Sequence, residues 1–155
     1  MIDTGSPAFD FTLQDQDGQT VTLSSLRGKW VVLYFYPKDL TPGCTTEACN
    51  FQEALPNFKS LNAEIIGVSK DTVKMHRKFA DKHNLNFRLV SDEEGKVCEA
   101  YGVWQEKNML GKRYMGIVRS TFIIDPDGKI AKVYPKVNVK DHHQEVEEAI
   151  KSLQK

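Results

Sequence analysis

The chain has 155 residues, of which 40% are hydrophobic and 27% are charged, with 21 basic and 21 acidic side chains. This length and composition predict a single globular domain over residues 1–155 and exclude a disordered chain. Because the formal net charge is zero, no polyanion-binding surface is indicated, and we expect no nucleic-acid partner.

Strand and helix signals alternate from the N-terminus onward. Residues 9–13 and 20–23 flank an Asp-Gly pair typical of a hairpin turn, so a short antiparallel pair is expected first. Residues 30–36 form a continuous apolar and aromatic run, as in a central strand covered on both faces. A helix is expected over residues 44–58 and a buried strand over residues 64–68.

The second half of the chain continues this alternation. We expect a helix, a strand, a short helix, two strands joined by a hairpin turn and a terminal amphipathic helix, over residues 73–83, 87–90, 97–101, 118–124, 130–134 and 139–153. Gly102 is expected to end the short helix as its C-cap. This order predicts an α/β thioredoxin-like fold, with a central mixed sheet flanked by helices and an N-terminal β-hairpin.

Targeting signals are not evident in the sequence. The first seven residues lack a basic region followed by an apolar core, and no apolar stretch approaches the ~20 residues that span a bilayer. We therefore expect a cytoplasmic protein with no membrane association. Three cysteines are too few, and odd in number, for a secreted disulfide framework, so they are expected to be reactive, metal-binding or buried.

Cys44 lies in the first turn of the helix that follows the 30–36 strand. Thr41 is expected as the N-cap of this helix and Pro42 as its first residue. Backbone N–H groups there have no intrahelical partner and the helix dipole favours negative charge, an environment that favours the thiolate form of a cysteine. Since the thiolate is the nucleophile, Cys44 is a candidate for redox or acyl-transfer chemistry.

The residues around Cys44 resemble a known family. The string Pro37-x-x-x-Thr41-x-x-Cys44 resembles the peroxidatic motif of the peroxiredoxins, and Cys49 resembles the second cysteine of the bacterioferritin comigratory protein, or peroxiredoxin Q, branch. The likeness extends to residues 5–9, 67–69, 101–103 and 119–128, so it covers nearly the whole chain. It implies a thiol-dependent peroxidase that reduces hydrogen peroxide and organic hydroperoxides and needs no prosthetic cofactor.

The resemblance also assigns a role to each motif residue. Cys44 is implied to be the peroxidatic cysteine, which becomes a sulfenic acid. Thr41 is expected to hydrogen-bond the peroxide and the thiolate, Pro37 to shield the site, and Arg119 to contact both reactants. Glu47 occupies the position of a glutamate that holds this arginine in many family members, so it is expected to orient Arg119.

Regeneration of Cys44 requires a second thiol, and the resemblance implies Cys49. Five residues along an α-helix separate two Cα atoms by about 8 to 9 Å, whereas a disulfide needs less than about 7 Å. The first turns of the helix must therefore unwind before a Cys44–Cys49 bond can form. Thioredoxin is the external reductant that the resemblance implies. The alternative is a core Cys49 in a one-cysteine enzyme that glutathione or a partner resolves.

The remaining polar residues are given structural roles. Cys98 is expected to be a buried core residue, with resolution of Cys44 as the alternative. We expect no metal site, since the cysteine spacing is unlike that of zinc ligands. The histidines are expected to be solvated or partly packed, with none placed as a base for Cys44. Lys38 and Asp39 are expected to be simple loop residues. Tyr36 is expected to be a core aromatic, with a place in the pocket wall as the alternative.

Two other functions are compatible with a reactive cysteine on this fold. One is a thiol-disulfide oxidoreductase, although such proteins normally carry a Cys-x-x-Cys pair that this sequence lacks. The other is a non-enzymatic peroxide sensor or redox relay, which passes the oxidised state of Cys44 to a partner. For the leading function, the peroxidase, we expect a monomer, with a weak homodimer as the alternative.

Overall fold

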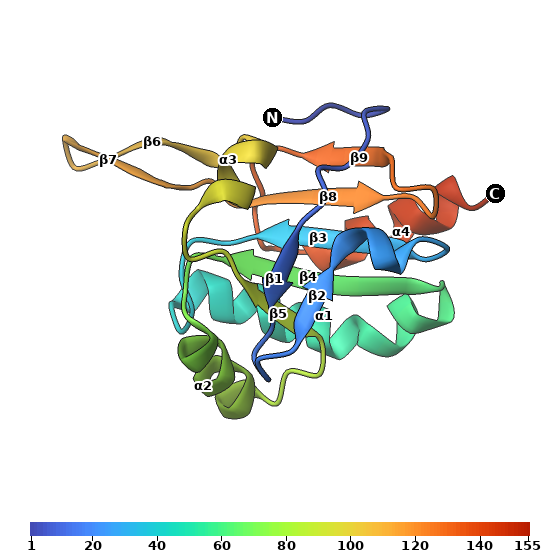
Figure 1. The fold of residues 1–155 in the computed structure, drawn as a ribbon, viewed down its shortest axis with the longest axis horizontal. Helices are drawn as coiled ribbons and strands as arrows, with labels where there is room; N and C mark the ends of the chain where they lie inside the picture. The colour runs from blue at the N-terminus through green and yellow to red at the C-terminus, as the bar shows by residue number, and fades with distance from the viewer.

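The computed structural model describes all 155 residues and has one central seven-stranded sheet with helices on both faces (Figure 1). In chain order the elements are β1 Thr12–Gln14, β2 Thr20–Thr22, the 3-10 helix η1 Leu23–Leu26, β3 Trp30–Phe35, α1 Pro42–Ser60, β4 Ala63–Ser69, α2 Val73–His83, β5 Arg88–Ser91, α3 Lys96–Tyr101, β6 Trp104–Met109, β7 Lys112–Ile117, β8 Ser120–Ile124, β9 Ile130–Tyr134 and α4 His142–Leu153. The alternation predicted from the sequence is confirmed, and the element boundaries differ by a few residues. None of the helices has the length and apolar character needed to cross a membrane.

The sheet is mixed, as the sequence predicts. Its strand order is β2-β1-β5-β4-β3-β8-β9. Strands β3, β4 and β5 run parallel, whereas β8 runs antiparallel to β3 and β1 runs antiparallel to β5. Strands β1 and β2 form the expected N-terminal hairpin, and β8 and β9 form the second one.

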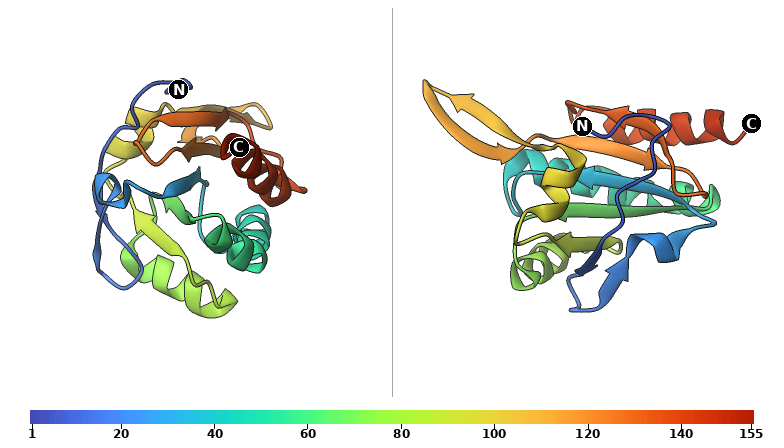
Figure 2. Two further views of the ribbon diagram at one scale, coloured as in Figure 1. Left: turned by 90° about the vertical axis from the view of Figure 1, so that its right-hand side faces the viewer. Right: turned by 45° about the horizontal axis from the view of Figure 1, so that its top comes forward.

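Strand β3 is buried on both faces, which explains its unbroken apolar run. Val32 and Tyr34 pack in a cluster with side chains of α1, α2 and α4. Leu33 and Phe35 pack on the other face, in a cluster with side chains of α3 and of the N-terminal segment. Alternate side chains of a strand point to opposite faces, so only a strand between two layers is apolar at every position. The left view of Figure 2 shows α1 and α4 together on one side of the sheet and α3 on the other.

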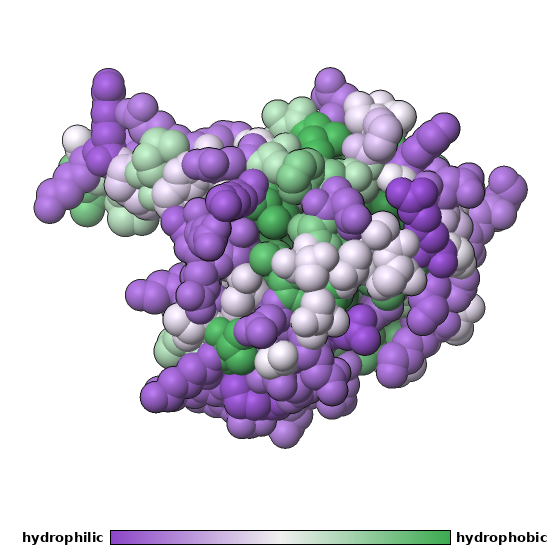
Figure 3. Space-filling model, viewed as in Figure 1, coloured by the Kyte–Doolittle hydropathy of each residue, from purple (hydrophilic) through white to green (hydrophobic).

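Residues 104–117 form a separate two-stranded sheet that the sequence patterns do not predict. Strands β6 and β7 pair antiparallel and project from the body of the molecule (Figure 1). Their turn places Leu110 and Gly111 at φ 53° and 82°, the left-handed values that a type I′ hairpin turn requires at both central positions. Leucine is uncommon in this conformation. Because Leu110 stands where Asn is usual, the sequence lacks the Asn-Gly pair that would signal a hairpin. Leu110 is 99% exposed, and apolar surface is visible on the projecting hairpin in Figure 3.

One edge of the sheet brings distant parts of the chain together. The parallel strands β3, β4 and β5 all end at this edge, and the loop from Phe35 to α1 leaves from it. Strand β8 runs the opposite way and begins there, because Ser120 pairs with Phe35. Arg119, directly before Ser120, therefore lies next to the start of α1. Loops at the carboxyl ends of parallel strands are the usual place for a binding site in such a sheet.

Candidate active site

Cys44 is the third residue of α1 and is 1% exposed. Thr41 occupies the N-cap position with an extended backbone and Pro42 is the first helical residue, as predicted. The Thr41 side chain makes no capping hydrogen bond. Its hydroxyl donates instead to the carbonyl oxygen of Lys38 at 2.8 Å. The helix terminus thus leaves backbone N–H groups of the first turn without a side-chain cap, in the same turn that holds the thiol.

Arg119 joins the thiol to a buried carboxylate. Its Nη2 lies 3.4 Å from Cys44 Sγ and its Nη1 donates to Glu47 Oε1 at 2.7 Å. Burial alone would lower the pKa of Arg119, but the negative charges of Glu47 and Cys44 outweigh burial and leave the pKa raised. The guanidinium is therefore a fixed cation, held by one residue and directed at the other.

Glu47 is buried at 2% exposure and is the acidic partner in this arrangement. Burial raises its pKa to about 7, and the charge of Arg119 and the hydrogen bond from Arg119 offset part of that rise. Its second oxygen, Oε2, has no hydrogen-bond partner. Glu47 thus holds Arg119 through one oxygen while its other oxygen stays buried without a hydrogen bond. This arrangement fits the orienting role expected from the family resemblance.

Two further residues shape the site, and no sequence pattern singles them out. A Cβ atom at Gly43 would lie 3.1 Å from Arg119 Nη2, so a glycine here lets the guanidinium approach the helix terminus. Lys107 on β6 donates to the Ile117 carbonyl at 2.7 Å. Burial and the charge of Arg119 lower the pKa of Lys107, and Cys44 acts in the opposite direction. The unpredicted hairpin therefore contributes a second cation near the thiol.

The other two cysteines have different surroundings. Cys49 is half-buried and lies on the same unbroken helix as Cys44, and both are free thiols. Burial raises the pKa of Cys49. Cys98 is fully buried on α3, in keeping with the structural role expected for it. Burial and the neighbouring Asp92 carboxylate raise the pKa of Cys98 strongly.

The histidine expectation is wrong for two of the four residues. His76 and His142 are 0% and 1% exposed, because each has polar partners that offset burial. His142 contacts Thr121 and Glu145. His76 lies on α2 and contacts Asp39 Oδ2 at 2.6 Å.

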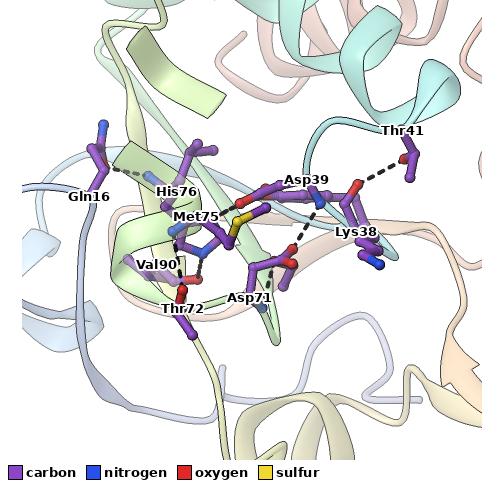
Figure 4. A network of polar contacts seen from close by, with 12 residues as sticks. Gln16, Lys38, Asp39, Thr41, Asp71, Thr72, Met75, His76 and Val90 are labelled. Atoms are coloured by element: carbon purple, nitrogen blue, oxygen red, sulfur yellow. Dashed lines mark hydrogen bonds and ion pairs between the residues drawn. The ribbon is translucent and has the colours of Figure 1, made fainter. Parts of the chain in front are cut away.

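Asp39 is in a loop, as expected, but it is not a simple loop residue, since its side chain is fully buried. Tyr36 is in the core, as expected, and its hydroxyl donates to Asp39 Oδ1 at 2.5 Å. Figure 4 shows the Asp39 carboxylate directed at His76, away from Thr41. These polar residues carry no sequence motif that relates them to one another.

Comparisons with known proteins agree over most of the chain. A model described as the AhpC/TSA family matches residues 4–133. The Peroxiredoxin Bcp of Bacillus subtilis (strain 168) is 51% identical over 152 residues, which is 98% of this chain and 97% of that protein. The Peroxiredoxin Bcp of Escherichia coli (strain K12) is 43% identical over 145 residues, or 94% of this chain and 93% of that protein.

Solved structures show the same likeness. The bacterioferritin comigratory protein of Xanthomonas campestris, studied for its alkyl peroxide reduction activity, has a TM-score of 0.92 at 43% identity and covers 99% of this chain and 100% of its own. A cysteine-to-serine variant of PrxQ from Xylella fastidiosa has a TM-score of 0.95 at 38% identity, with 100% and 99% coverage. These structures share the thioredoxin-like arrangement of sheet and helices described above.

Proposed function

Since the chain belongs to the AhpC/TSA family and is a peroxiredoxin, a thiol-dependent peroxidase, we propose that Cys44 is the residue that attacks the peroxide. The observation that carries this assignment is the contact of the Arg119 guanidinium with Cys44 Sγ at 3.4 Å. Of the three cysteines, Cys44 is the one hydrogen-bonded by a cationic side chain. A fixed cation stabilises the thiolate and supplies donors to an oxygen on which charge develops.

The proposed reaction begins with attack of the Cys44 thiolate on one peroxide oxygen. The S–O bond forms as the O–O bond breaks, which leaves a sulfenic acid on Cys44 and releases an alkoxide or hydroxide. The released anion takes a proton from solvent to give an alcohol or water. Arg119 lowers the barrier because its remaining N–H groups can donate to the departing oxygen, and Glu47 keeps the guanidinium in place.

Thr41 and Pro37 hold the substrate in this proposal. The Thr41 hydroxyl has one donor, already engaged by the Lys38 carbonyl, and two acceptor lone pairs. It therefore accepts a hydrogen bond from the O–H of the hydroperoxide, which aligns the O–O bond with the sulfur. Pro37 is half-buried beside this loop and shields the site from bulk water. The proposed substrates are hydrogen peroxide and small organic hydroperoxides.

Cys49 is the proposed resolving residue. Both cysteines lie within one continuous helix, so α1 must unwind at its start before the sulfurs can meet. The Cys49 thiol then displaces water from the sulfenic acid and an intramolecular disulfide forms. An external dithiol, thioredoxin in our proposal, reduces this bond. We further propose that the protein acts as a cytoplasmic monomer without a prosthetic cofactor.

A count of free thiols tests these assignments. One equivalent of hydrogen peroxide is added to the fully reduced protein and to its Cys44→Ser and Cys49→Ser variants. We expect the wild type to lose two of its three thiols, Cys44→Ser to lose none, and Cys49→Ser to form a trappable sulfenic acid. If Cys49→Ser still loses two thiols, Cys98 or a second chain resolves the intermediate. If Cys44→Ser reacts as fast as the wild type, the assignment of Cys44 is wrong.

A further inference from the structure

A buried polar cluster lies directly before the active-site helix. The Asp39 side chain and His76 are both fully buried, and Asp39 Oδ2 lies 2.6 Å from His76 Nδ1. Tyr36 donates its hydroxyl to the other Asp39 oxygen at 2.5 Å. The Asp39 backbone N–H donates to Asp71 Oδ2 at 2.8 Å. Figure 4 shows this loop held from two sides, by His76 on α2 and by Asp71 on the loop that follows β4.

The hydrogen bonds of His76 require a proton in its contact with Asp39. His76 Nε2 lies 3.0 Å from the carbonyl oxygen of Val90, and a carbonyl can only accept, so Nε2 must carry a proton. In a neutral imidazole the other nitrogen, Nδ1, would then be an acceptor. An ionised Asp39 is also an acceptor, and two acceptors do not form a contact of 2.6 Å between fully buried side chains. One proton therefore lies between Asp39 Oδ2 and His76 Nδ1, and it joins them in a short buried hydrogen bond.

The same residues do not form a convincing metal site. Ligand atoms of Asp39, Asp71 and His76 lie within 4.8 Å of one another. Each is already used within the protein, because Asp71 Oδ2 accepts from Ser69 and from the Asp39 backbone while Asp39 and His76 bond each other. All these partners belong to the chain, so the arrangement is complete without an ion.

The position of Asp39 connects this contact to the chemistry. Asp39 precedes Cys44 by five residues, and the intervening chain passes through Leu40 at φ 64° and enters α1 at Pro42. Unwinding the start of α1 gains conformational entropy for the segment that is released. While Asp39 is fixed, that segment remains a short closed loop with few conformations. Loss of the contact would free the end of the loop and favour unwinding.

We propose that the proton-bridged Asp39–His76 contact is a latch that holds the start of α1 in its folded conformation. Asp39 and His76 are thus positioning residues for Cys44, since neither contacts the thiol. This inference rests on the proposed function, in which the folded helix reacts with peroxide and the unwound helix forms the Cys44–Cys49 disulfide. The latch sets the balance between these two states.

Amide hydrogen exchange over residues 40–48 of the reduced protein tests the latch without any peroxide. Leaving one partner of a buried hydrogen bond unpaired costs a factor of about ten or more, so we expect Asp39→Ala and His76→Ala to speed this exchange at least about tenfold. Asp39→Asn is the conservative variant, because its amide can donate to Nδ1 of a neutral His76 while its oxygen accepts from Tyr36. We expect its exchange to stay within about threefold of the wild type.

His142→Ala is the matched control, since His142 is equally buried but contacts Thr121 and Glu145 rather than the loop. It should lower global stability without speeding exchange at residues 40–48. Unchanged exchange in both the Asp39→Ala and His76→Ala variants would overturn the latch, as would equal acceleration in the control. Asp39→Asn exchanging as fast as Asp39→Ala would overturn the proton bridge.

Two readouts keep the inference separate from the proposed function. In the unsubstituted protein, NMR should show a strongly hydrogen-bonded proton at His76 Nδ1, and its absence would contradict the bridge even if variants fail to fold. With peroxide and reductant, Asp39→Ala should form less sulfinic acid and more disulfide than the wild type. If exchange responds as expected but peroxide consumes no thiol, the proposed function fails and the latch stands. If peroxide consumes thiols but the variants exchange residues 40–48 no faster than the wild type, the latch is rejected and the proposed function stands.

Discussion

Cys44 and Cys98 are equally buried, at 1% and 0% exposure, yet their surroundings are opposite. Cys44 lies against the Arg119 guanidinium, with Glu47 behind it. Cys98 lies near the Asp92 carboxylate, and burial together with that carboxylate raises the pKa of its thiol, against a smaller opposing effect of Lys70. Burial therefore does not distinguish Cys44, the proposed reactive cysteine, from Cys98, whereas the contact of Cys44 Sγ with a cationic side chain does.

The largest expected effect comes from removing each thiol in turn. We expect Cys44→Ser to slow peroxide consumption by at least about a thousandfold, because neither of the other thiols is hydrogen-bonded by a cationic side chain. Cys98→Ala should retain the wild-type rate within about twofold. Second-order rate constants from stopped-flow mixing with hydrogen peroxide would measure both. A large loss in Cys98→Ala with intact folding would contradict the distinction between the two sites.

Removing the cation from the Cys44 site should be the next largest effect. Arg119→Met keeps an unbranched stem similar to that of arginine but loses the charge and all donors, so we expect the rate constant with peroxide to fall about a hundredfold. Arg119→Lys restores the charge without the planar fork and should give an intermediate rate. The same stopped-flow measurement applies. If Arg119→Met reacts as fast as the wild type, the charge beside Cys44 is not what separates it from Cys98.

The acidic residues of the two sites also differ, and Glu47 offers a test by pH. Burial raises the pKa of Glu47 from 4.5 to about 7, so the folded state binds this proton more tightly than the unfolded state. The resulting stability is present below about pH 4.5 and is lost as the pH rises through about 7, by on the order of 3 kcal/mol.

Glu47→Gln should remove this contribution to the pH dependence. Its amide oxygen can still accept from Arg119, so we expect only a few-fold loss of peroxidase rate. Urea unfolding at pH 5 and pH 8 would compare the variant with the wild type. Equal slopes of stability against pH in the two proteins would show that Glu47 does not carry the buried charge.

The sequence predicts the parts of this comparison that depend on local patterns. The strand and helix periods, the helix start at Pro42 and the C-cap at Gly102 are confirmed because adjacent residues determine them. Arg119 and Glu47 were assigned only through the family resemblance, since no local pattern relates residues 72 positions apart. The Asp39–His76 contact has neither kind of signal, because both residues are ordinary polar types until the fold brings them together. Sequence patterns do not predict the hairpin, because Leu110 occupies a turn position that usually holds Asn or Gly.

The smallest expected effect tests how closely Arg119 must approach the helix terminus. Gly43 has no close backbone neighbour, and the nearest atom to an added Cβ is Arg119 Nη2 at 3.1 Å. A methyl group at this distance makes the guanidinium move by a few tenths of an ångström, which a flexible side chain can do at modest cost. We expect Gly43→Ala to lower the rate constant with peroxide by about threefold to tenfold while the unfolding free energy stays within about 1 kcal/mol. Alanine also favours the helix more than glycine does, so a loss of rate without a loss of stability would locate the effect in the Arg119–Cys44 contact. An unchanged rate would mean that the guanidinium supports the thiolate through its charge, independent of its exact position.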